Sequence, residues 1–179
     1  MSDEPPRRLP DFNLPKLGGG RLSLTELRGN IIVLNFWSAE CPWSRRADVV
    51  LTYRHLTWER KGVRIVGIAC NVNEPEQEIH AEVETRHIKY PILLDQDQKV
   101  ANLYRVETTP QFYIADKQGI LRYMGALDDA SANRRRPRVI HVDQAVTALL
   151  NDSLPNPAVT SPYGCAIVRA SDNVALNKA

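Results

Sequence analysis

Residues 31–46 read IIVLNFWSAECPWSRR, and this stretch decides the fold class. Its first part, Ile31 to Leu34, is an apolar run with the length and β-branched content of a buried strand. Its last part leads into a predicted helix, and Pro42 suits the first helical position. Cys41 therefore lies at a strand-to-helix turn, where free N–H groups and the helix dipole favour a thiolate.

The residue three positions after Cys41 departs from the usual pattern of such turns. The common dithiol motif is Cys-x-x-Cys, and here its fourth position is Ser44. Arg45 and Arg46, one turn into the helix, favour a thiolate at Cys41, whereas Glu40 opposes it. We expect Cys41 to be a nucleophile that attacks a disulfide or a peroxide, and an inert buried cysteine is the alternative.

The composition indicates a globular protein of one domain. The chain has 179 residues, of which 43% are hydrophobic and 25% charged. A formal net charge of +2 is too small to argue for a nucleic-acid partner. The run Arg134 to Arg138 is a local exception, which either binds an anion or an acidic partner or forms a solvated loop.

No membrane or export signal is visible. No apolar stretch approaches the roughly 20 residues that a membrane span needs. Residues 1–8 precede no apolar segment, so we expect no signal peptide and a cytoplasmic location. A leader that had been replaced by a new Met would leave the same sequence.

The cysteine count predicts neither a disulfide framework nor a metal site. The chain holds only Cys41, Cys70 and Cys165, and its four histidines form no ligand spacing with them. Cys70 closes an apolar strand, so we expect a structural role there.

Hydrophobic periodicity predicts alternating strands and helices. Expected strands span residues 31–37, 63–70, 91–94, 111–115 and 120–124, and expected helices span 44–61, 74–87, 99–104 and 139–150. This order predicts an α/β fold with a central mixed sheet flanked by helices, because the last two strands form a hairpin. We expect one domain over residues 1–150, which includes an N-terminal extension. A Pro-rich C-terminal tail, 151–179, carries Cys165.

Two of the helices have a predicted apolar face. In the helix over 139–150 the face consists of Val142, Ala145, Val146 and Leu149. In the helix over 44–61 it consists of Val49, Val50, Tyr53, Leu56 and Thr57.

These features together resemble the thioredoxin-like superfamily. The resemblance rests on residues 36–44, on Thr109-Pro110 before a strand, and on the hairpin that follows. An inserted β-α unit between Val63 and Leu94 is similar to the AhpC/TSA or redoxin branch, and within it to TlpA/ResA-like thiol–disulfide oxidoreductases, with CPWS in place of Cys-x-x-Cys. The resemblance covers roughly residues 9–150 and implies a thioredoxin-like fold.

Ser44 leaves open how a mixed disulfide at Cys41 would be resolved. Ser44 can donate a hydrogen bond to the thiolate but cannot form a disulfide. Either another thiol resolves the intermediate, or the site works with one thiol, or the fold has become a binding scaffold. Cys165 offers the missing thiol, because the ten residues before it, if extended, span about 30 Å. A tail cysteine without a role is the alternative.

The resemblance also implies a substrate groove. Pro110 would form the cis-proline loop that faces the nucleophile, and the backbone of Thr109 would pair with an extended substrate. Trp43 would shape a hydrophobic rim for a partner. Peroxiredoxins place a Pro seven residues before their cysteine, where this chain has Leu34, so a peroxidase is less favoured.

The expected function is therefore thiol-based redox chemistry. Cys41 attacks a protein or small-molecule disulfide, or less favourably a hydroperoxide, and Cys165 or an external thiol reductant completes the cycle. Such a site needs no organic cofactor and no metal. A redox-inactive peptide-binding module and a monothiol peroxidase remain the alternatives.

Overall fold

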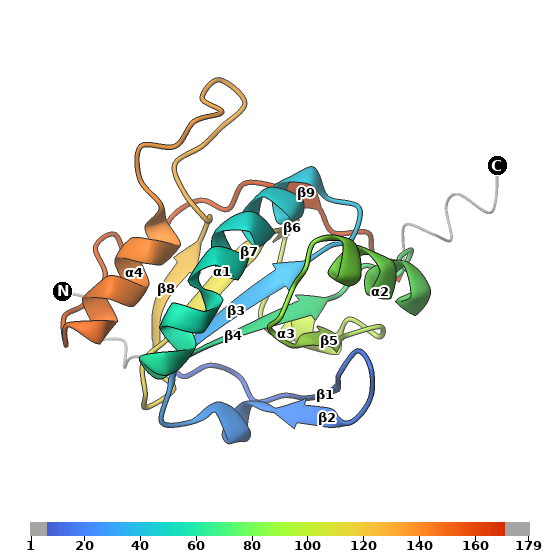
Figure 1. The fold of residues 1–179 in the computed structure, drawn as a ribbon, viewed down its shortest axis with the longest axis horizontal. Coiled ribbons are helices and arrows are strands. Elements are labelled where there is room, and N and C mark those ends of the chain that lie inside the picture. Colours follow the sequence, from blue (N-terminus) through green and yellow to red (C-terminus); the bar gives the residue numbers. More distant parts are fainter. Residues whose placement is uncertain (1–6, 171–179) are drawn as a thin grey trace.

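The computed structural model describes residues 7–170 (Figure 1). The expectation of no leader rests mainly on residues 1–6, and the predicted tail extends to residue 179. Residues 1–6 and 171–179 lie outside the described part of the chain.

The elements follow the predicted alternation of strands and helices. In chain order they are β1 (Asn13–Pro15), β2 (Arg21–Ser23), the 3-10 helix η1 (Leu24–Leu27), β3 (Ile31–Trp37), α1 (Pro42–Arg60), β4 (Val63–Ala69), α2 (Glu76–Thr85), β5 (Ile92–Leu94), α3 (Lys99–Leu103), β6 (Thr108–Thr109), β7 (Gln111–Ala115), β8 (Leu121–Gly125), α4 (His141–Leu150) and β9 (Cys165–Ala166).

The central sheet is mixed, as the sequence predicts. Its strand order is β5-β4-β3-β7-β8. β3 pairs in parallel with β4, and β4 with β5, whereas β7 runs antiparallel to both β3 and β8. β3 is therefore the middle strand, and its carboxyl end delivers the chain to the turn that carries Cys41. These features confirm the thioredoxin-like α/β fold.

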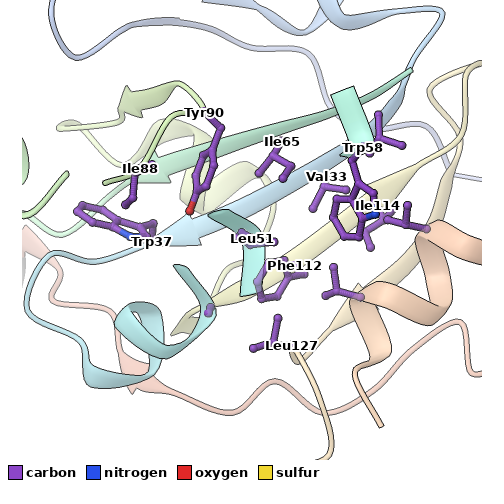
Figure 2. Close-up of a cluster of buried hydrophobic side chains, with 14 of the residues drawn as sticks. Val33, Trp37, Leu51, Trp58, Ile65, Ile88, Tyr90, Phe112, Ile114 and Leu127 are labelled. Atoms are coloured by element: carbon purple, nitrogen blue, oxygen red, sulfur yellow. The ribbon is translucent and has the colours of Figure 1, made fainter. Parts of the chain in front are cut away.

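Apolar side chains cover both faces of this sheet because strand residues alternate between its two sides. One core lies under α1 and α4, and it includes Val33, Leu51 and Phe112 (Figure 2). Val146 of α4 belongs to the same cluster. The other core lies between the sheet and α3 with the N-terminal segment. The predicted apolar face of α4 is confirmed, since Val142, Ala145, Val146 and Leu149 are all buried.

The predicted apolar face of α1 is wrong except at Val50, which is half-buried and packs against the core. Val49, Tyr53 and Leu56 are 71%, 80% and 63% exposed, and the residues that pack inward are Ser44, Ala47, Asp48, Leu51 and Trp58. Both stripes have helical spacing, so periodicity alone does not distinguish them. The buried stripe has small side chains that allow close approach to the sheet, and its Asp48 has hydrogen-bond partners inside.

The C-terminal segment after α4 lies against the domain. Met124 exchanges backbone hydrogen bonds with Ala158 and Thr160 at the edge of β8. Further on, β9 pairs antiparallel with β6 in a separate two-stranded sheet. The chain then passes the loop after β4, where Val168 accepts a hydrogen bond from the N–H of Val72. No helix within residues 7–170 combines the length and apolar character needed to cross a bilayer.

Candidate active site

Cys41 lies at the junction of β3 and α1, as the sequence predicts. It is the N-cap residue of α1 with extended backbone angles, and Pro42 occupies the first helical turn. Its side chain is 2% exposed. The N–H groups at the start of α1 have no partner within the helix, so they are available to the sulfur.

A buried carboxylate accepts hydrogen bonds from the N–H and hydroxyl groups of the loop before Cys41. Glu74, in the segment between β4 and α2, accepts hydrogen bonds from the N–H groups of Ala39 (3.0 Å) and Glu40 (3.2 Å). Glu74 also accepts a hydrogen bond from the Ser38 hydroxyl. The oxygen of this hydroxyl in turn accepts a hydrogen bond from the N–H of Cys41 at 3.1 Å. Glu74 thus reaches the Cys41 backbone through one hydroxyl.

A buried guanidinium donates hydrogen bonds to the carbonyl oxygens of the same loop. Arg86 donates to the carbonyl oxygens of Ser38 and Ala39 and pairs with the Asp48 carboxylate at 2.9 Å. Asp48 also accepts hydrogen bonds from the Trp37 indole and the Tyr90 hydroxyl. Burial raises the pKa of Asp48 even though these three donors oppose the shift.

The Thr109–Pro110 peptide bond is cis, as the resemblance predicts. The loop faces Cys41, whose Sγ lies 3.0 Å from the Thr109 carbonyl oxygen. This carbonyl accepts a hydrogen bond from the neutral thiol, so the contact favours the protonated form of Cys41.

Cys165 lies beside Cys41. In the β6–β9 ladder it is the direct partner of Thr109, whose carbonyl the Cys41 thiol contacts. The Cys165 side chain and backbone N–H both hydrogen-bond to the Cys41 sulfur. Gly164 makes this approach possible, because a Cβ atom there would lie 2.1 Å from the Thr109 carbonyl oxygen. Both cysteines are free, and no disulfide joins them in this structure.

Trp43 and Tyr163 form an aromatic pair close in sequence to the two cysteines. Their rings pack edge to face with centroids 4.6 Å apart. Trp43 follows Cys41 by two positions, and Tyr163 precedes Cys165 by two positions. The aromatic rim that the sequence predicts at Trp43 therefore packs against the protein's own C-terminal segment.

Ser44 contributes differently from the prediction. Its hydroxyl accepts a hydrogen bond from the N–H of Ser38 at 3.2 Å, and no bond from this hydroxyl to the Cys41 sulfur occurs among the described residues. The backbone N–H of Ser44 bonds to that sulfur instead. Ser44 is thus placed at the site, with its side chain supporting the loop.

The two thiols have opposite pKa shifts. Burial raises the pKa of Cys41, but hydrogen bonds from the Cys165 side chain and from the N–H groups of Ser44, Cys165 and Trp43 outweigh it, so the net pKa is lowered. Burial, the bond to Cys41 and the charge on Cys41 raise the pKa of Cys165 to about 12. Cys41 is therefore the thiol that ionises more readily, and Cys165 is the thiol that donates to its sulfur.

The third cysteine behaves as a core residue. Cys70 is completely buried in the core on the α3 side, and burial raises its pKa to about 12. Within residues 7–170, no group of three His, Cys, Asp or Glu side chains is arranged to hold a metal ion.

Sequence reasoning missed Glu74, Arg86 and Tyr163. A signal for Glu74 existed, since segments after parallel strands gather at one edge of a sheet and Glu74 follows β4. Arg86 had no comparable signal, because it lies at the end of α2 and reaches the site only through packing.

Comparisons with known proteins identify the family of the chain. The family model for the AhpC/TSA family matches residues 5–124. The protein named thiol-disulfide oxidoreductase ResA from Geobacillus thermodenitrificans is 33% identical over 110 residues, which is 62% of either chain. The chain thus matches less than two thirds of the length of this curated relative.

Two solved structures are similar over nearly the whole chain. An uncharacterized conserved protein from Geobacillus kaustophilus has a TM-score of 0.84 at 26% identity, and the match covers 91% of this chain and 90% of that one. A hypothetical protein from Sinorhizobium meliloti 1021 has a TM-score of 0.83 at 26% identity, with 95% and 97% covered. Both matches cover more than 150 of the 179 residues, so they extend beyond residue 150 into the C-terminal segment.

Proposed function

The chain belongs to the AhpC/TSA family, and from this premise we propose that it is a thiol–disulfide oxidoreductase that uses Cys41 and Cys165 as its dithiol. The observation that carries the proposal is the placement of Cys165 opposite Thr109 of the cis-proline loop, where its side chain hydrogen-bonds with that of Cys41. Cys165 supplies from the C-terminal segment the thiol that Ser44 does not supply in α1.

The reaction begins at Cys41. Its thiolate attacks one sulfur of a substrate disulfide, forms a mixed disulfide and releases the other half of the substrate as a thiolate. The N–H groups at the start of α1 stabilise the attacking anion. Cys41 loses its negative charge in this step.

Cys165 completes the exchange. Since the charge on Cys41 is part of what raises the pKa of Cys165, formation of the mixed disulfide makes Cys165 easier to deprotonate. The Cys165 thiolate then attacks Cys41 Sγ, releases the second substrate thiolate and leaves a Cys41–Cys165 disulfide. The substrate gains two electrons and the protein loses two, and an external thiol reductant returns them.

The alternatives have less support. A free peptide-binding module needs an open backbone edge at Thr108–Thr109, but β9 occupies this edge. A monothiol peroxidase gives no role to the contact between Cys165 and Cys41. The Leu34 position, where peroxiredoxins have Pro, also argues against a peroxidase.

One titration tests the proposal. The reduced protein is treated with one equivalent of a disulfide, and its linkages are mapped by non-reducing peptide mass spectrometry. We expect a Cys41–Cys165 disulfide in the native protein and a stable adduct on Cys41 in Cys165→Ser. Cys70→Ser is the matched control and should behave as native. A Cys41 that stays unmodified would refute the proposal, and an adduct on Cys41 that persists in the native protein would refute the role of Cys165.

A further inference from the structure

A pocket lies beside the Trp43–Tyr163 aromatic pair. It has a volume of about 460 Å³, within the range of small-molecule sites. Pro42 and Trp43 form one wall, Tyr163 another, and Ser131, Ala132 and Arg135 close it from the loop between β8 and α4. The residues that flank both cysteines therefore line this pocket.

The loop that closes the pocket is strongly basic. We call residues 129–138 the arginine arm, and this loop projects from the domain between β8 and α4 (Figure 1). Asp129 holds the two ends of the arm together, because it accepts the N–H groups of Arg138 (2.8 Å) and Val139 (3.2 Å). The two ends of the arm are thus held next to each other by hydrogen bonds.

Most of the positive charge near the pocket is not neutralised. Arg46 pairs with Asp128, and Arg134 pairs with Asp129 at 2.9 Å. No acidic side chain among residues 7–170 pairs with Arg135, Arg136 or Arg138. Arg135 lines the pocket itself, so a bound ligand would meet a cation without a counter-charge.

The backbone beside Cys41 limits the size of the ligand. An extended protein substrate would have to pair with Thr108–Thr109, but β9 already pairs there. A small molecule can instead enter over Trp43 and Tyr163 without displacing β9. The apolar walls would contact its carbon atoms, and the guanidinium of Arg135 would contact its charged group.

Building on the proposed function, we infer that the pocket selects small disulfides that carry a carboxylate. The substrate binds with its carboxylate toward Arg135 and its disulfide toward the Trp43–Tyr163 pair, and these rings part to admit a sulfur atom to Cys41. The exchange itself is the one described above.

Three small disulfides of similar size test the inference. Dithiodiglycolate is anionic, bis(2-hydroxyethyl) disulfide is neutral and cystamine is cationic. The rate constant for formation of the Cys41–Cys165 disulfide is measured with each of the three compounds. Each rate constant is divided by that of free 2-mercaptoethanol with the same compound, which removes differences in intrinsic reactivity. We expect a preference of about tenfold or more for the anionic over the cationic disulfide at low ionic strength, which falls at high salt.

Variants of the arm separate the pocket from the overall charge. Arg135→Glu combined with Arg136→Glu should abolish or reverse the preference. Lys117→Glu is the control at the opposite end of the sheet, in the turn between β7 and β8, and should keep it. Equal normalised rates for the three disulfides, or a preference that survives in the arm variant, would overturn the inference. Arm-dependent exchange with a disulfide-linked acidic peptide but not with dithiodiglycolate would also overturn it.

A second measurement keeps this inference distinct from the proposed function. Alkylation of Cys41 by iodoacetate and by iodoacetamide needs no disulfide exchange. The rate constant for alkylation by iodoacetate is divided by that for iodoacetamide, and this ratio is compared with the ratio for free 2-mercaptoethanol. The ratio for Cys41 should fall in the arm variant and not in Lys117→Glu. If no disulfide reacts but this ratio falls as expected, the proposed function fails while the anionic preference stands. An unchanged ratio counts against the pocket.

Discussion

At the scale of single residues, the two facing thiols are made unequal by their surroundings. The Cys41 sulfur accepts hydrogen bonds from N–H groups at the start of α1 and from the Cys165 thiol, and these bonds lower the pKa of Cys41. Cys165 faces the resulting negative charge, which stabilises its protonated form. Under the proposed mechanism, the first sulfur is the one that attacks, and the second becomes reactive only after the first has lost its charge.

The hydrogen bond from Cys165 can be tested by a pair of substitutions. Cys165→Ala removes the donor, so the pKa of Cys41 should rise by on the order of one unit. A hydrogen bond to a charged group contributes about 1.5–3 kcal/mol, and one pKa unit equals about 1.4 kcal/mol. Cys165→Ser keeps a hydroxyl donor and should cause a smaller rise. The pH dependence of Cys41 alkylation by iodoacetamide measures both, and the curve should move to higher pH in the order native, Ser, Ala. Coinciding curves for Ser and Ala would contradict this assignment.

Glu74 and Arg86 both bond to the loop before Cys41 and share Ser38 and Ala39 as partners. The carboxylate accepts hydrogen bonds from the Ser38 hydroxyl and from the N–H groups of Ala39 and Glu40, and the guanidinium donates to the carbonyl oxygens of Ser38 and Ala39. Because each buried charge bonds to backbone groups of the complementary polarity, both desolvation costs are partly offset. The loop before Cys41 is therefore a positioned segment.

At the scale of elements, α1 shows why apolar periodicity alone can select the wrong face. Its buried stripe contains Ser44 and Asp48, which a hydrophobic pattern assigns to the solvent side. Asp48 is buried because the Trp37 indole, the Tyr90 hydroxyl and Arg86 all donate to it. These donors come from three other segments, so a pattern within one helix contains no information about them.

The orientation of α1 predicts unequal costs for two similar truncations. Leu51→Ala, in the buried stripe, should lower the free energy of unfolding by about 2–5 kcal/mol because it removes packed methyl groups and leaves a cavity. Val49→Ala, on the exposed stripe, should change it by less than about 0.5 kcal/mol. Urea denaturation of both variants measures the difference, and equal losses would contradict the buried face described here.

At the scale of the whole molecule, the C-terminal segment closes the site. It follows the edge of β8, passes Tyr163 over Trp43 and pairs β9 with the cis-proline loop. Cys41 is buried beneath this segment. Access of a substrate to Cys41 therefore depends on a segment that folds back from the far end of the chain.

Gly164 provides a test of this closure. Gly164→Ala would place a methyl group against the Thr109 carbonyl and should separate β9 from β6. We expect faster alkylation of Cys41 by iodoacetamide and slower formation of the Cys41–Cys165 disulfide, each by about tenfold for an estimated loss of 1.4 kcal/mol of docking free energy. Ala166→Ser, at an exposed position of the same strand, is the control and should change neither rate. Unchanged rates in Gly164→Ala would contradict the role assigned to the segment.

Much of the architecture could be predicted because it depends on local patterns. The strands β3, β4 and β7, the hairpin to β8 and the buried face of α4 follow from short apolar runs and turn residues, whose preferences act within a few positions. The position of Cys41 at a helix start follows in the same way. The cis form of Pro110 and the fold family came from the resemblance and agree with the structure.

The rest depends on contacts between segments that are distant in sequence. Local preferences cannot state that Cys165 pairs with Thr109, that Glu74 and Arg86 hold the loop before Cys41, or which stripe of α1 turns inward. Such contacts form only when packing and strand register bring the segments together and satisfy their buried polar groups. The sequence by itself thus determined the place of Cys41 at a strand-to-helix junction and the frame that carries it, whereas only the tertiary structure decided which second thiol and which charges meet it.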